Sequence, residues 1–340
     1  MAQTHTSGEA SVRFRLSPRR PYSLALTAAR YARFTEAVDR FDAGVYRRLL
    51  PVGRRGVLLS VAQTGGPDRA ILEVELEGRG SDSEAARSAA LRVVEVALGA
   101  ASDVRGFYRD CGHDAILSAA IRDFRGMRIA GWPSLWEALV TAILSQQVNL
   151  KFAYDIRREL ALALGRRARF GGRIYAAFPT PEEFRDDSPR TLIRFRLSRS
   201  KAAAIDGLAR AFASGALSEE AVAALSDDEA ILKLTSFRGV GRWTAEIALL
   251  RGLGRTDIFP AGDLGVVKYL AIGLLGRDAR APEAEMRRFA ERWQPHRGFA
   301  LAYAYAELAR REALSAPTRP RPRRAPGPRC RPESARSRTG

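Results

Sequence analysis

The chain has 340 residues, 46% of them hydrophobic, and a formal net charge of +18 at pH 7 with an isoelectric point near 10.9. This length predicts about two domains. No apolar run approaches the roughly 18 residues of a membrane span, and residues 1–16 lack the apolar core of a signal peptide. We therefore expect a cytoplasmic protein without membrane contact. Two cysteines, Cys111 and Cys330, and three scattered histidines exclude a disulfide framework, an iron–sulfur cluster and a protein-held zinc site, so no metal or cofactor is expected.

The positive charge points to a polyanionic partner. Residues 316–340 carry eight arginines against the single acidic Glu333, a net +7, and the 315 residues before them still carry +11. Lysine and arginine side chains that replace the counterions condensed on nucleic acid release those ions, which favours binding. The alternative is the arginine- and alanine-rich composition that GC-rich genomes give to many proteins. We take nucleic acid as the leading partner class.

The first 112 residues predict a small α+β domain with an antiparallel sheet. The segment "SVRFRL" at 11–16 alternates apolar and polar residues, and "RGVLLSV" and "AILEVELEG" flank the turn-forming "GGPD" at 65–68 as the arms of a β-hairpin. Residues 21–34 favour a helix instead. An amphipathic helix over about 82–98 completes this domain.

From residue 113 to 315 the sequence predicts a mainly α-helical body with short connections. Two helix starts are marked by capping boxes, Thr180–Glu183 and Ser226–Glu229, in which a hydroxyl and a carboxylate satisfy the first backbone groups. Beyond the body, the Pro- and Arg-rich residues 316–340 are predicted to be disordered, because such a composition buries no core. The predicted helices cover 133–147, 149–164, 181–186, 200–214, 218–225, 227–236, 243–253, 264–275, 282–293 and 297–314.

The stretch "LTSFRGVGRWTAEIALL" at 234–250 divides two amphipathic helices at Gly239-Val240-Gly241. Gly239 and Gly241 permit positive φ and carry no side chains, so successive backbone N–H groups can point outward at the start of the second helix. Such a nest and a helix N-terminus both attract anions, which in a basic protein predicts a DNA phosphate. Arg238 and Arg242 extend the expected contact. The alternative is that the glycines only turn the chain.

The longer segment "LTSFRGVGRWTAEIALLRGLGRTDIFPAGDLGVVKYL" resembles the helix-hairpin-helix, Gly/Pro-rich loop and aspartate of the DNA glycosylase superfamily, which removes damaged bases. Together with "GWPSLWEALVTAILSQQVNLKFA" and "MRRFAERWQPHRGFALAYAYAEL", it is most similar to the bacterial 3-methyladenine DNA glycosylase II family, over roughly residues 115–312. The resemblance implies an antiparallel-sheet domain before the helical body. It also implies base excision repair of double-stranded DNA by a monomer at the cytoplasmic nucleoid.

Asp263, in the loop "FPAGDLG" twenty positions after Trp243, matches the catalytic aspartate of the superfamily. When an N-glycosidic bond is cleaved, positive charge develops on the deoxyribose as the base departs. A fixed carboxylate near C1′ stabilises that charge and orients the attacking water, provided that the carboxylate is ionised. The alternative for a Gly-Asp pair at a helix start is an ordinary N-cap.

Gln147 is the candidate for a wedge that enters the duplex. A base inside a duplex lies out of reach of any carboxylate, so it must be flipped out at a cost of a few kcal/mol. The resemblance places Gln147, in "ILSQQVN" at the end of an apolar helix, where the family fills the space left by the flipped base. The alternative is a solvent-exposed amide at a helix end.

The resemblance implies an aromatic pocket for the flipped base. Trp243 and Tyr305 match two of its positions, while Ile247 stands where some relatives carry Tyr, which leaves the width of the substrate range open. Electron-rich ring faces attract a cationic base such as 3-methyladenine or 7-methylguanine by about 0.5–2 kcal/mol per contact. Four further aromatic residues are candidates for pocket or core: Trp132, Trp136, Phe299 and Tyr303.

The resemblance also implies a monofunctional hydrolase. Bifunctional members of the superfamily carry, at the position of Trp243, a lysine whose amine attacks the sugar and leads to strand cleavage, and an indole cannot do this. Lys233 and Lys268 lie nearby in sequence but outside the matched position. Two other functions stay open. One is a glycosylase for uracil, mismatched or oxidised bases, and the other is a non-enzymatic helix-hairpin-helix clamp on DNA, for which Asp263 has no use.

Overall fold

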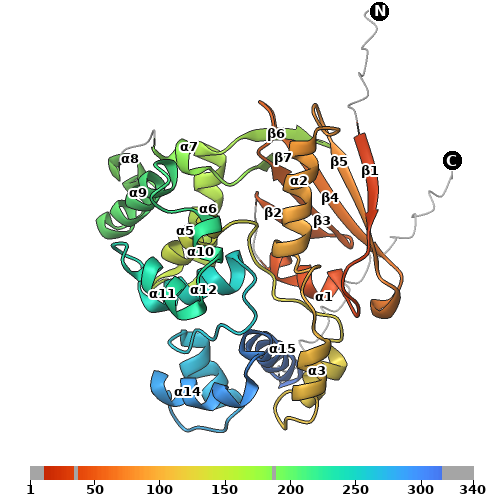
Figure 1. Ribbon diagram of the computed structural model, residues 1–340, viewed down its shortest axis with the longest axis vertical. Coiled ribbons are helices and arrows are strands. Elements are labelled where there is room, and N and C mark those ends of the chain that lie inside the picture. Colours follow the sequence, from red (N-terminus) through yellow and green to blue (C-terminus); the bar gives the residue numbers. More distant parts are fainter. Residues whose placement is uncertain (1–10, 34–36, 186–188, 316–340) are drawn as a thin grey trace, which may run out of the picture.

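The computed structural model describes residues 11–33, 37–185 and 189–315, so the tail predicted over 316–340 lies outside the described residues. Figure 1 shows a β-sheet covered by a helix on one side of the molecule and a larger group of helices beside and below it. This arrangement confirms the predicted fold class, an α+β N-terminal region followed by a mainly α-helical body.

The sheet has five antiparallel strands in the order β1-β5-β4-β3-β2. These strands are β1 (Ser11–Leu16), β2 (Asp39–Asp42), β3 (Val45–Leu50), β4 (Val57–Thr64) and β5 (Ile71–Glu77). The predicted hairpin is confirmed, because β4 and β5 pair across a connection that contains one short 3-10 turn, Pro67–Arg69. The predicted helix over 21–34 is shorter than expected: it consists of α1 (Leu24–Ala28) and a 3-10 turn, η1 (Ala29–Ala32).

The sequence of β5 explains which face of the sheet is buried. Its apolar residues alternate with glutamates, and they form a core with the apolar side of α2 (Glu84–Arg92) and of the π-helix that continues it, η3 (Val93–Ala97). On the other face, Glu75 pairs with Arg13 of β1. Alternation with a period of two is typical of an antiparallel sheet with one covered face. The predicted helix over 82–98 is therefore confirmed, and it lies across the sheet (Figure 1).

The structure confirms the two capping boxes predicted at helix starts in the body. Ser226 and Glu229 form a complete capping box, and Thr180 and Glu183 exchange the same pair of hydrogen bonds. The helices after α2 are α3 (Arg105–Cys111), α4 (Ser118–Asp123), α5 (Leu135–Ser145), α6 (Leu150–Leu164), α7 (Pro181–Arg185), α8 (Pro189–Ile193), α9 (Arg199–Ala213), α10 (Glu219–Ala223), α11 (Asp227–Thr235), α12 (Arg242–Gly252), α13 (Ala271–Gly273), α14 (Glu283–Ala290) and α15 (Arg297–Ser315), with a π-helix η4 (Gly265–Leu270) and a 3-10 turn η5 (Glu291–Trp293).

The body also contains one short β-hairpin that is not predicted from the sequence. Between α6 and α7 the chain forms a two-stranded hairpin, β6 (Arg167–Phe170) and β7 (Arg173–Ala176), whose turn consists of two glycines with positive φ. Phe170 and Tyr175 of this hairpin pack against leucines of β3 and β4. An isolated two-stranded hairpin is marginal in water, so this one depends on the sheet that it covers.

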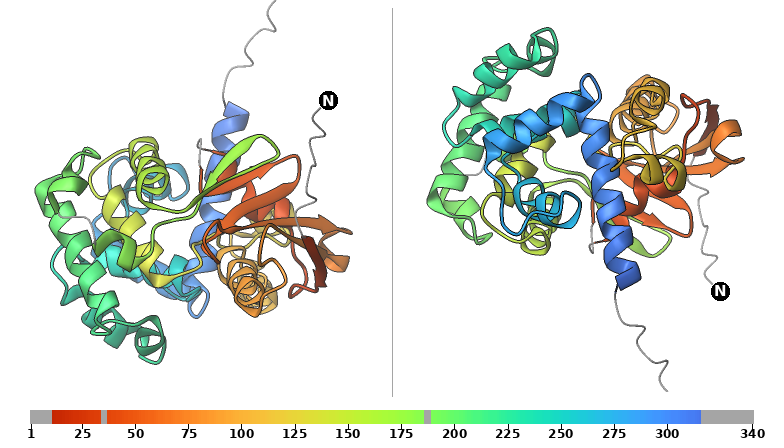
Figure 2. Two further views of the ribbon diagram at one scale, coloured as in Figure 1. Left: turned by 90° about the horizontal axis from the view of Figure 1, so that it is seen from above. Right: turned by 90° about the horizontal axis from the view of Figure 1, so that it is seen from below.

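Helix α15 lies between the sheet region and the other helices (Figure 2). Its Phe299 and Tyr303 are buried against Phe107 of α3, with ring centroids 5.7 and 5.0 Å from that ring. Trp132 and Trp136 are buried in the same core. The four aromatic residues that were candidates for either the base pocket or the core are thus core residues. The domain boundary near residue 112 stays a prediction, and α3, on its N-terminal side, packs with the body.

A cluster of charged side chains is buried where the sheet meets the helices. Asp39 of β2 accepts hydrogen bonds from Arg48 at 2.7 Å and from Arg157 at 2.9 Å. Glu137 of α5 bonds the same two arginines, and Tyr46 donates to Asp39 at 2.5 Å. Burial alone would raise the pKa of Asp39, and the two arginine charges outweigh burial and lower it. We call these five residues the buried charge cluster; it holds the sheet against α5 and α6.

Candidate active site

The two glycines of the hairpin between α11 and α12 differ in conformation. Gly239 has φ +84°, and a Cβ there would lie 2.4 Å from Cβ of Ala204 on α9, so both the conformation and the close contact require glycine. Gly241 has φ −85° and ψ 172°, and a Cβ there would meet no atom within 4 Å. Gly241 is extended because it is the N-cap of α12, and N-caps take an extended conformation.

The start of α12 is exposed and has no side-chain cap. Gly241 offers no capping oxygen, whereas serines cap α9 and α11, so the first N–H groups of α12 are left for an external acceptor. Val240 is buried and anchors the turn. Arg238 is exposed, while Arg242 bonds the buried Glu246 through Nε at 2.9 Å. The hairpin thus presents backbone donors with a free arginine on one side and a partly engaged one on the other.

Three donors fix the carboxylate of Asp263 in the loop that follows α12. Its Oδ1 accepts hydrogen bonds from the backbone N–H of Gly265 at 2.8 Å and from the hydroxyl of Tyr305 at 2.9 Å. Its Oδ2 accepts one from the indole N–H of Trp243 at 2.8 Å. The Gly265 contact is local, as at an ordinary helix start, but the other two come from residues 20 and 42 positions away, on α12 and α15. The structure thus brings three predicted site residues together.

These three donors are electrically neutral. An indole N–H and a backbone N–H can only donate a hydrogen bond. Burial raises the pKa of the Tyr305 hydroxyl well above its ordinary range, and the neighbouring Asp263 charge raises it further, so this hydroxyl stays protonated and donates. The donors orient the carboxylate without neutralising it. A carboxylate held in this way can stabilise positive charge that develops beside it.

Trp243, Ile247 and Arg251 follow one another at intervals of four residues and line one face of α12. Trp243 and Ile247 are both partly buried, and Ile247 packs against the main hydrophobic core. Burial and, to a smaller extent, the nearby charge of Arg30 lower the pKa of Arg251 to about 10. Arg251 donates a hydrogen bond to the backbone carbonyl of Ala130.

Gln147 lies exposed in the short turn between α5 and α6. Its φ of 54° is in the left-handed region, which non-glycine residues rarely adopt. The preceding residue, Gln146, donates a hydrogen bond to the carbonyl of Gly239 at 3.0 Å. The two segments predicted to contact DNA, the hairpin and the turn with Gln147, are therefore neighbours in space.

The chain has four lysines, and each makes a contact away from Asp263. Lys233 and Lys268 lie with Nζ 5.9 and 5.3 Å from the ring centroids of neighbouring aromatic residues. Lys151 pairs with a carboxylate on its own helix at 2.8 Å, and Lys201 donates to two backbone carbonyls at the end of α5. None of these contacts is with Asp263.

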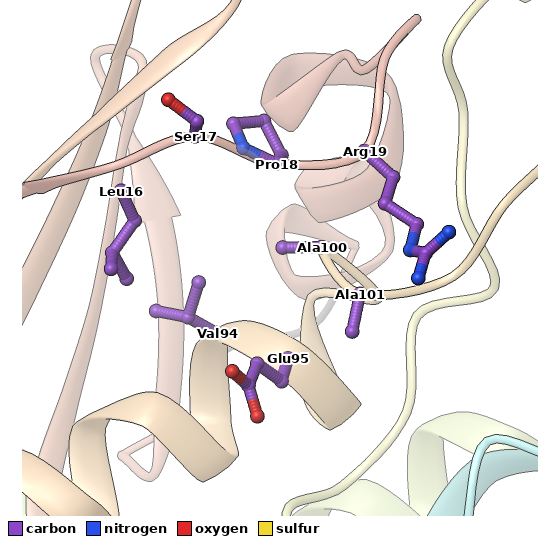
Figure 3. A pocket seen from close by; sticks show the side chains of 8 residues that line it. All are labelled: Leu16, Ser17, Pro18, Arg19, Val94, Glu95, Ala100 and Ala101. Carbon is purple, nitrogen blue, oxygen red and sulfur yellow. The ribbon is translucent and has the colours of Figure 1, made fainter.

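Two cavities in the structure lie away from Asp263. The cavity in Figure 3 has a volume of about 230 Å³, and a second one of about 280 Å³ lies between η3 and the end of α12. Within the described ranges, no three His, Cys, Asp or Glu side chains gather as metal ligands, and none of the helices has the length and apolar character of a membrane span. The residues that line the cavity in Figure 3 are Leu16, Ser17, Pro18, Arg19, Val94, Glu95, Ala100 and Ala101.

Known proteins resemble this chain in sequence and in fold. Residues 140–295 match the HhH-GPD superfamily base excision DNA repair protein family. The chain is 31% identical to the DNA-3-methyladenine glycosylase of Bacillus subtilis, over 61% of this chain and 68% of that protein, and 31% identical to DNA-3-methyladenine glycosylase 2 of Escherichia coli, over 53% and 60%. The 3-methyladenine DNA-glycosylase from Archaeoglobus fulgidus has the same fold, with a TM-score of 0.74 and 26% identity over 87% of this chain and 98% of that one. This chain therefore belongs to the DNA-3-methyladenine glycosylase family of the HhH-GPD superfamily.

Proposed function

We propose that the protein is a monofunctional DNA glycosylase that hydrolyses the N-glycosidic bond of alkylated bases, of the 3-methyladenine and 7-methylguanine class, in double-stranded DNA. The observation that carries the proposal is the carboxylate of Asp263, held on both oxygens by Trp243, Tyr305 and Gly265. A clamp that only binds DNA has no use for a carboxylate held in this way. The relatives are named as 3-methyladenine glycosylases, and this supports the proposed substrate class.

DNA binding starts at the hairpin. The uncapped N–H groups at Gly241 and the positive end of the α12 dipole bind a backbone phosphate, and Arg238 adds a charged contact. These contacts are independent of base sequence and set the position of the strand. Gln147 then enters the duplex from the neighbouring turn and fills the space that the flipped nucleotide leaves.

The flipped base stacks against Trp243 and Tyr305, with Ile247 as the apolar wall one turn along α12. The glycosidic bond breaks, the bonding electrons leave with the base, and the positive charge on the sugar is stabilised by Asp263. Water adds at C1′ and loses a proton. A base that carries a positive charge departs as a neutral molecule, so its departure needs no proton donor. The site thus favours alkylated, cationic bases over neutral ones by the chemistry of the leaving group.

The absence of lyase activity is part of the proposal. Trp243 stands at the position of the lyase nucleophile, and its N–H is bonded to Asp263. Strand cleavage by β-elimination requires an amine that forms a Schiff base. We expect an intact abasic strand as the product, and no protein–DNA adduct when borohydride is added during turnover. Efficient trapping of an adduct would contradict a monofunctional enzyme.

A panel of duplexes with one lesion each tests the substrate class. The lesions are 7-methylguanine, 3-methyladenine, uracil opposite guanine, 8-oxoguanine and no lesion, and the measurement is the single-turnover excision rate with excess enzyme. We expect the two cationic bases to be excised fastest. Faster excision of uracil or 8-oxoguanine would replace the proposed substrate class by the neutral-base alternative, and no excision of any base would favour the non-enzymatic clamp.

A further inference from the structure

The turn that carries Gln147 is only four residues long and has both of its ends capped. Gln146 is the C-cap of α5, and its backbone N–H donates to the carbonyl of Ile143. Asn149 is the N-cap of α6, and its side chain accepts the N–H of Phe152 at 2.8 Å. Between them, Gln147 is held at φ 54°. We call residues 146–149 the wedge turn.

The side chain of Gln146 ties the wedge turn to the hairpin. Its Nε2 donates to the backbone carbonyl of Gly239 at 3.0 Å and to the hydroxyl of Thr244, in the first turn of α12, also at 3.0 Å. Thr244 is 1% exposed, so this second contact is inside the protein. One amide group therefore contacts both sides of the turn that is expected to bind phosphate.

Helix α9 joins the same two segments from a third side. Lys201 donates through Nζ to the carbonyls of Leu144 at 3.1 Å and Gln146 at 2.7 Å, where a cation is favoured at the C-terminal end of α5. Burial lowers the pKa of Lys201. Three residues further along α9, Ala204 lies against Gly239 with no room for a side chain between them. The wedge turn, the hairpin and the start of α9 are thus joined directly by hydrogen bonds and close packing.

We propose that Gln146 is a positioning residue that fixes the wedge turn relative to the phosphate-binding hairpin, so that docking of the backbone phosphate sets the position from which Gln147 enters the duplex. This inference rests on the proposed function of Gln147. Without the bonds of Gln146, the left-handed conformation at Gln147 loses a restraint, and the turn relaxes to conformations in which the side chain no longer points consistently toward the duplex. Base flipping then becomes slower, while the chemistry at Asp263 is unchanged.

A positioning role and a merely structural role differ in one measurable ratio. A purely structural loss lowers the amount of active protein and reduces excision from every substrate by the same factor. Loss of the wedge position slows only those substrates whose base must first leave a paired stack. The readout is therefore the excision rate of 7-methylguanine in a fully paired duplex divided by its rate in an unpaired bubble of the same duplex, a ratio that does not depend on active concentration.

We expect Gln146→Leu, which keeps the side-chain bulk and removes both donors, to lower this ratio about tenfold, as the loss of one to two hydrogen bonds implies. Thr244→Val removes one acceptor only and should lower the ratio less. Gln63→Leu is the control, because the side-chain amide of Gln63 also bonds backbone groups, those of Tyr22, Leu24 and Gly65, in the sheet region and far from the hairpin in sequence. It should leave the ratio unchanged.

Gln147→Ala separates this inference from the proposed function. If Gln147→Ala lowers the ratio and Gln146→Leu leaves it at the wild-type value, the positioning role is overturned and the wedge stands. If neither variant changes the ratio, the wedge itself is overturned and the inference fails with it. If Gln63→Leu lowers the ratio as much as Gln146→Leu does, the effect is structural and the positioning role is again overturned.

Discussion

Two regions of the molecule hold carboxylates in fixed positions, and they do so with opposite kinds of partner. In the buried charge cluster, Asp39 and Glu137 bond the guanidinium groups of Arg48 and Arg157, so two negative charges meet two positive ones. At Asp263 the partners are an indole, a phenol and a backbone amide. Cationic partners neutralise an acid and make burial tolerable, whereas neutral partners orient it and leave its charge available for catalysis.

The largest effect is expected from Asp263→Asn, which keeps the shape of the side chain and removes its charge. Excision should fall by at least about 10²- to 10³-fold, because the main electrostatic stabilisation of the transition state is lost. Binding to a duplex with an abasic analogue should stay nearly unchanged or increase somewhat. Single-turnover excision of 7-methylguanine measures the excision rate, and fluorescence anisotropy measures the affinity for the duplex. Excision close to the wild-type rate would remove Asp263 from the mechanism.

Arg157→Met tests the buried charge cluster, the other region of the comparison. This variant leaves the charges of Asp39 and Glu137 with one arginine between them, and we expect the free energy of unfolding to fall by about 3–5 kcal/mol. Excision per folded molecule should not change. The control is Arg210→Met, since Arg210 pairs with Asp206 on the surface and is 65% exposed, so its loss should cost less than about 1 kcal/mol. Equal losses in the two variants, measured by urea unfolding, would mean that burial of the cluster does not matter.

The buried charge cluster also predicts a pH dependence. The pKa of Asp39 is lower in the folded protein than in the unfolded chain, so its contribution to stability is present above the unfolded value of roughly 4 and is lost as pH falls through the folded value. The stability difference between the wild type and Arg157→Met should therefore be largest near neutral pH and shrink in acid. A difference that stays constant down to pH 3 would contradict this assignment.

Gly241→Asp should weaken DNA binding, by about tenfold at low salt, without harming the fold. Aspartate is a favoured N-cap, so α12 keeps or gains stability, but the new carboxylate occupies the anion position and repels phosphate. The loss should be the same for every base sequence and lesion. Gly207→Asp adds the same charge at an exposed position of α9 and should have little effect. Wild-type affinity of Gly241→Asp for an abasic-analogue duplex would show that phosphate binds elsewhere.

The smallest effect is expected from Tyr305→Phe, which removes one neutral donor from Asp263 and leaves the ring. Because the hydrogen bond is present before and during the reaction, only the orientation of the carboxylate suffers, and excision should fall by less than about tenfold. Tyr303→Phe, two residues earlier on α15, removes a buried phenol that contacts Tyr108 and backbone carbonyls instead. It should cost stability and leave excision per folded molecule unchanged. A loss for Tyr305→Phe as large as that for Asp263→Asn would give the phenol a catalytic role of its own.

Much of the fold follows from local patterns in the sequence. The alternation in β5 and the capping box at Ser226 identify a strand and a helix start without tertiary information. The hairpin of β6 and β7 is different, because its strands are four residues each and are stabilised by Phe170 and Tyr175 against the N-terminal sheet. Its only local signal is the pair of glycines between the strands. A strand that is stabilised by contacts with a distant segment is hard to predict from a short window of sequence.

At the site, the sequence identifies Asp263 and Trp243 but not the bonds between them. The spacing of twenty residues between Trp243 and Asp263 does not determine where the indole N–H points. Tyr305 lies on a different helix, α15, so its bond to Asp263 cannot be read from this spacing either. The extended conformation of Gly241 is also invisible, because glycine is compatible with both signs of φ. Glu137 is a lone acid in the apolar run "LWEALVTAIL", and an acid that is buried in such a run is almost always paired, as Glu137 is with Arg157.

The hairpin of β6 and β7 links the helical body to the sheet. The body extends this hairpin over the sheet, while the sheet supplies three members of the buried charge cluster, Asp39, Tyr46 and Arg48, to helices of the body. Removal of the sheet would expose Phe170 and Tyr175 and leave Glu137 and Arg157 without their partners from β2 and β3. The helical body of this chain therefore depends on the sheet for the burial and the pairing of these side chains.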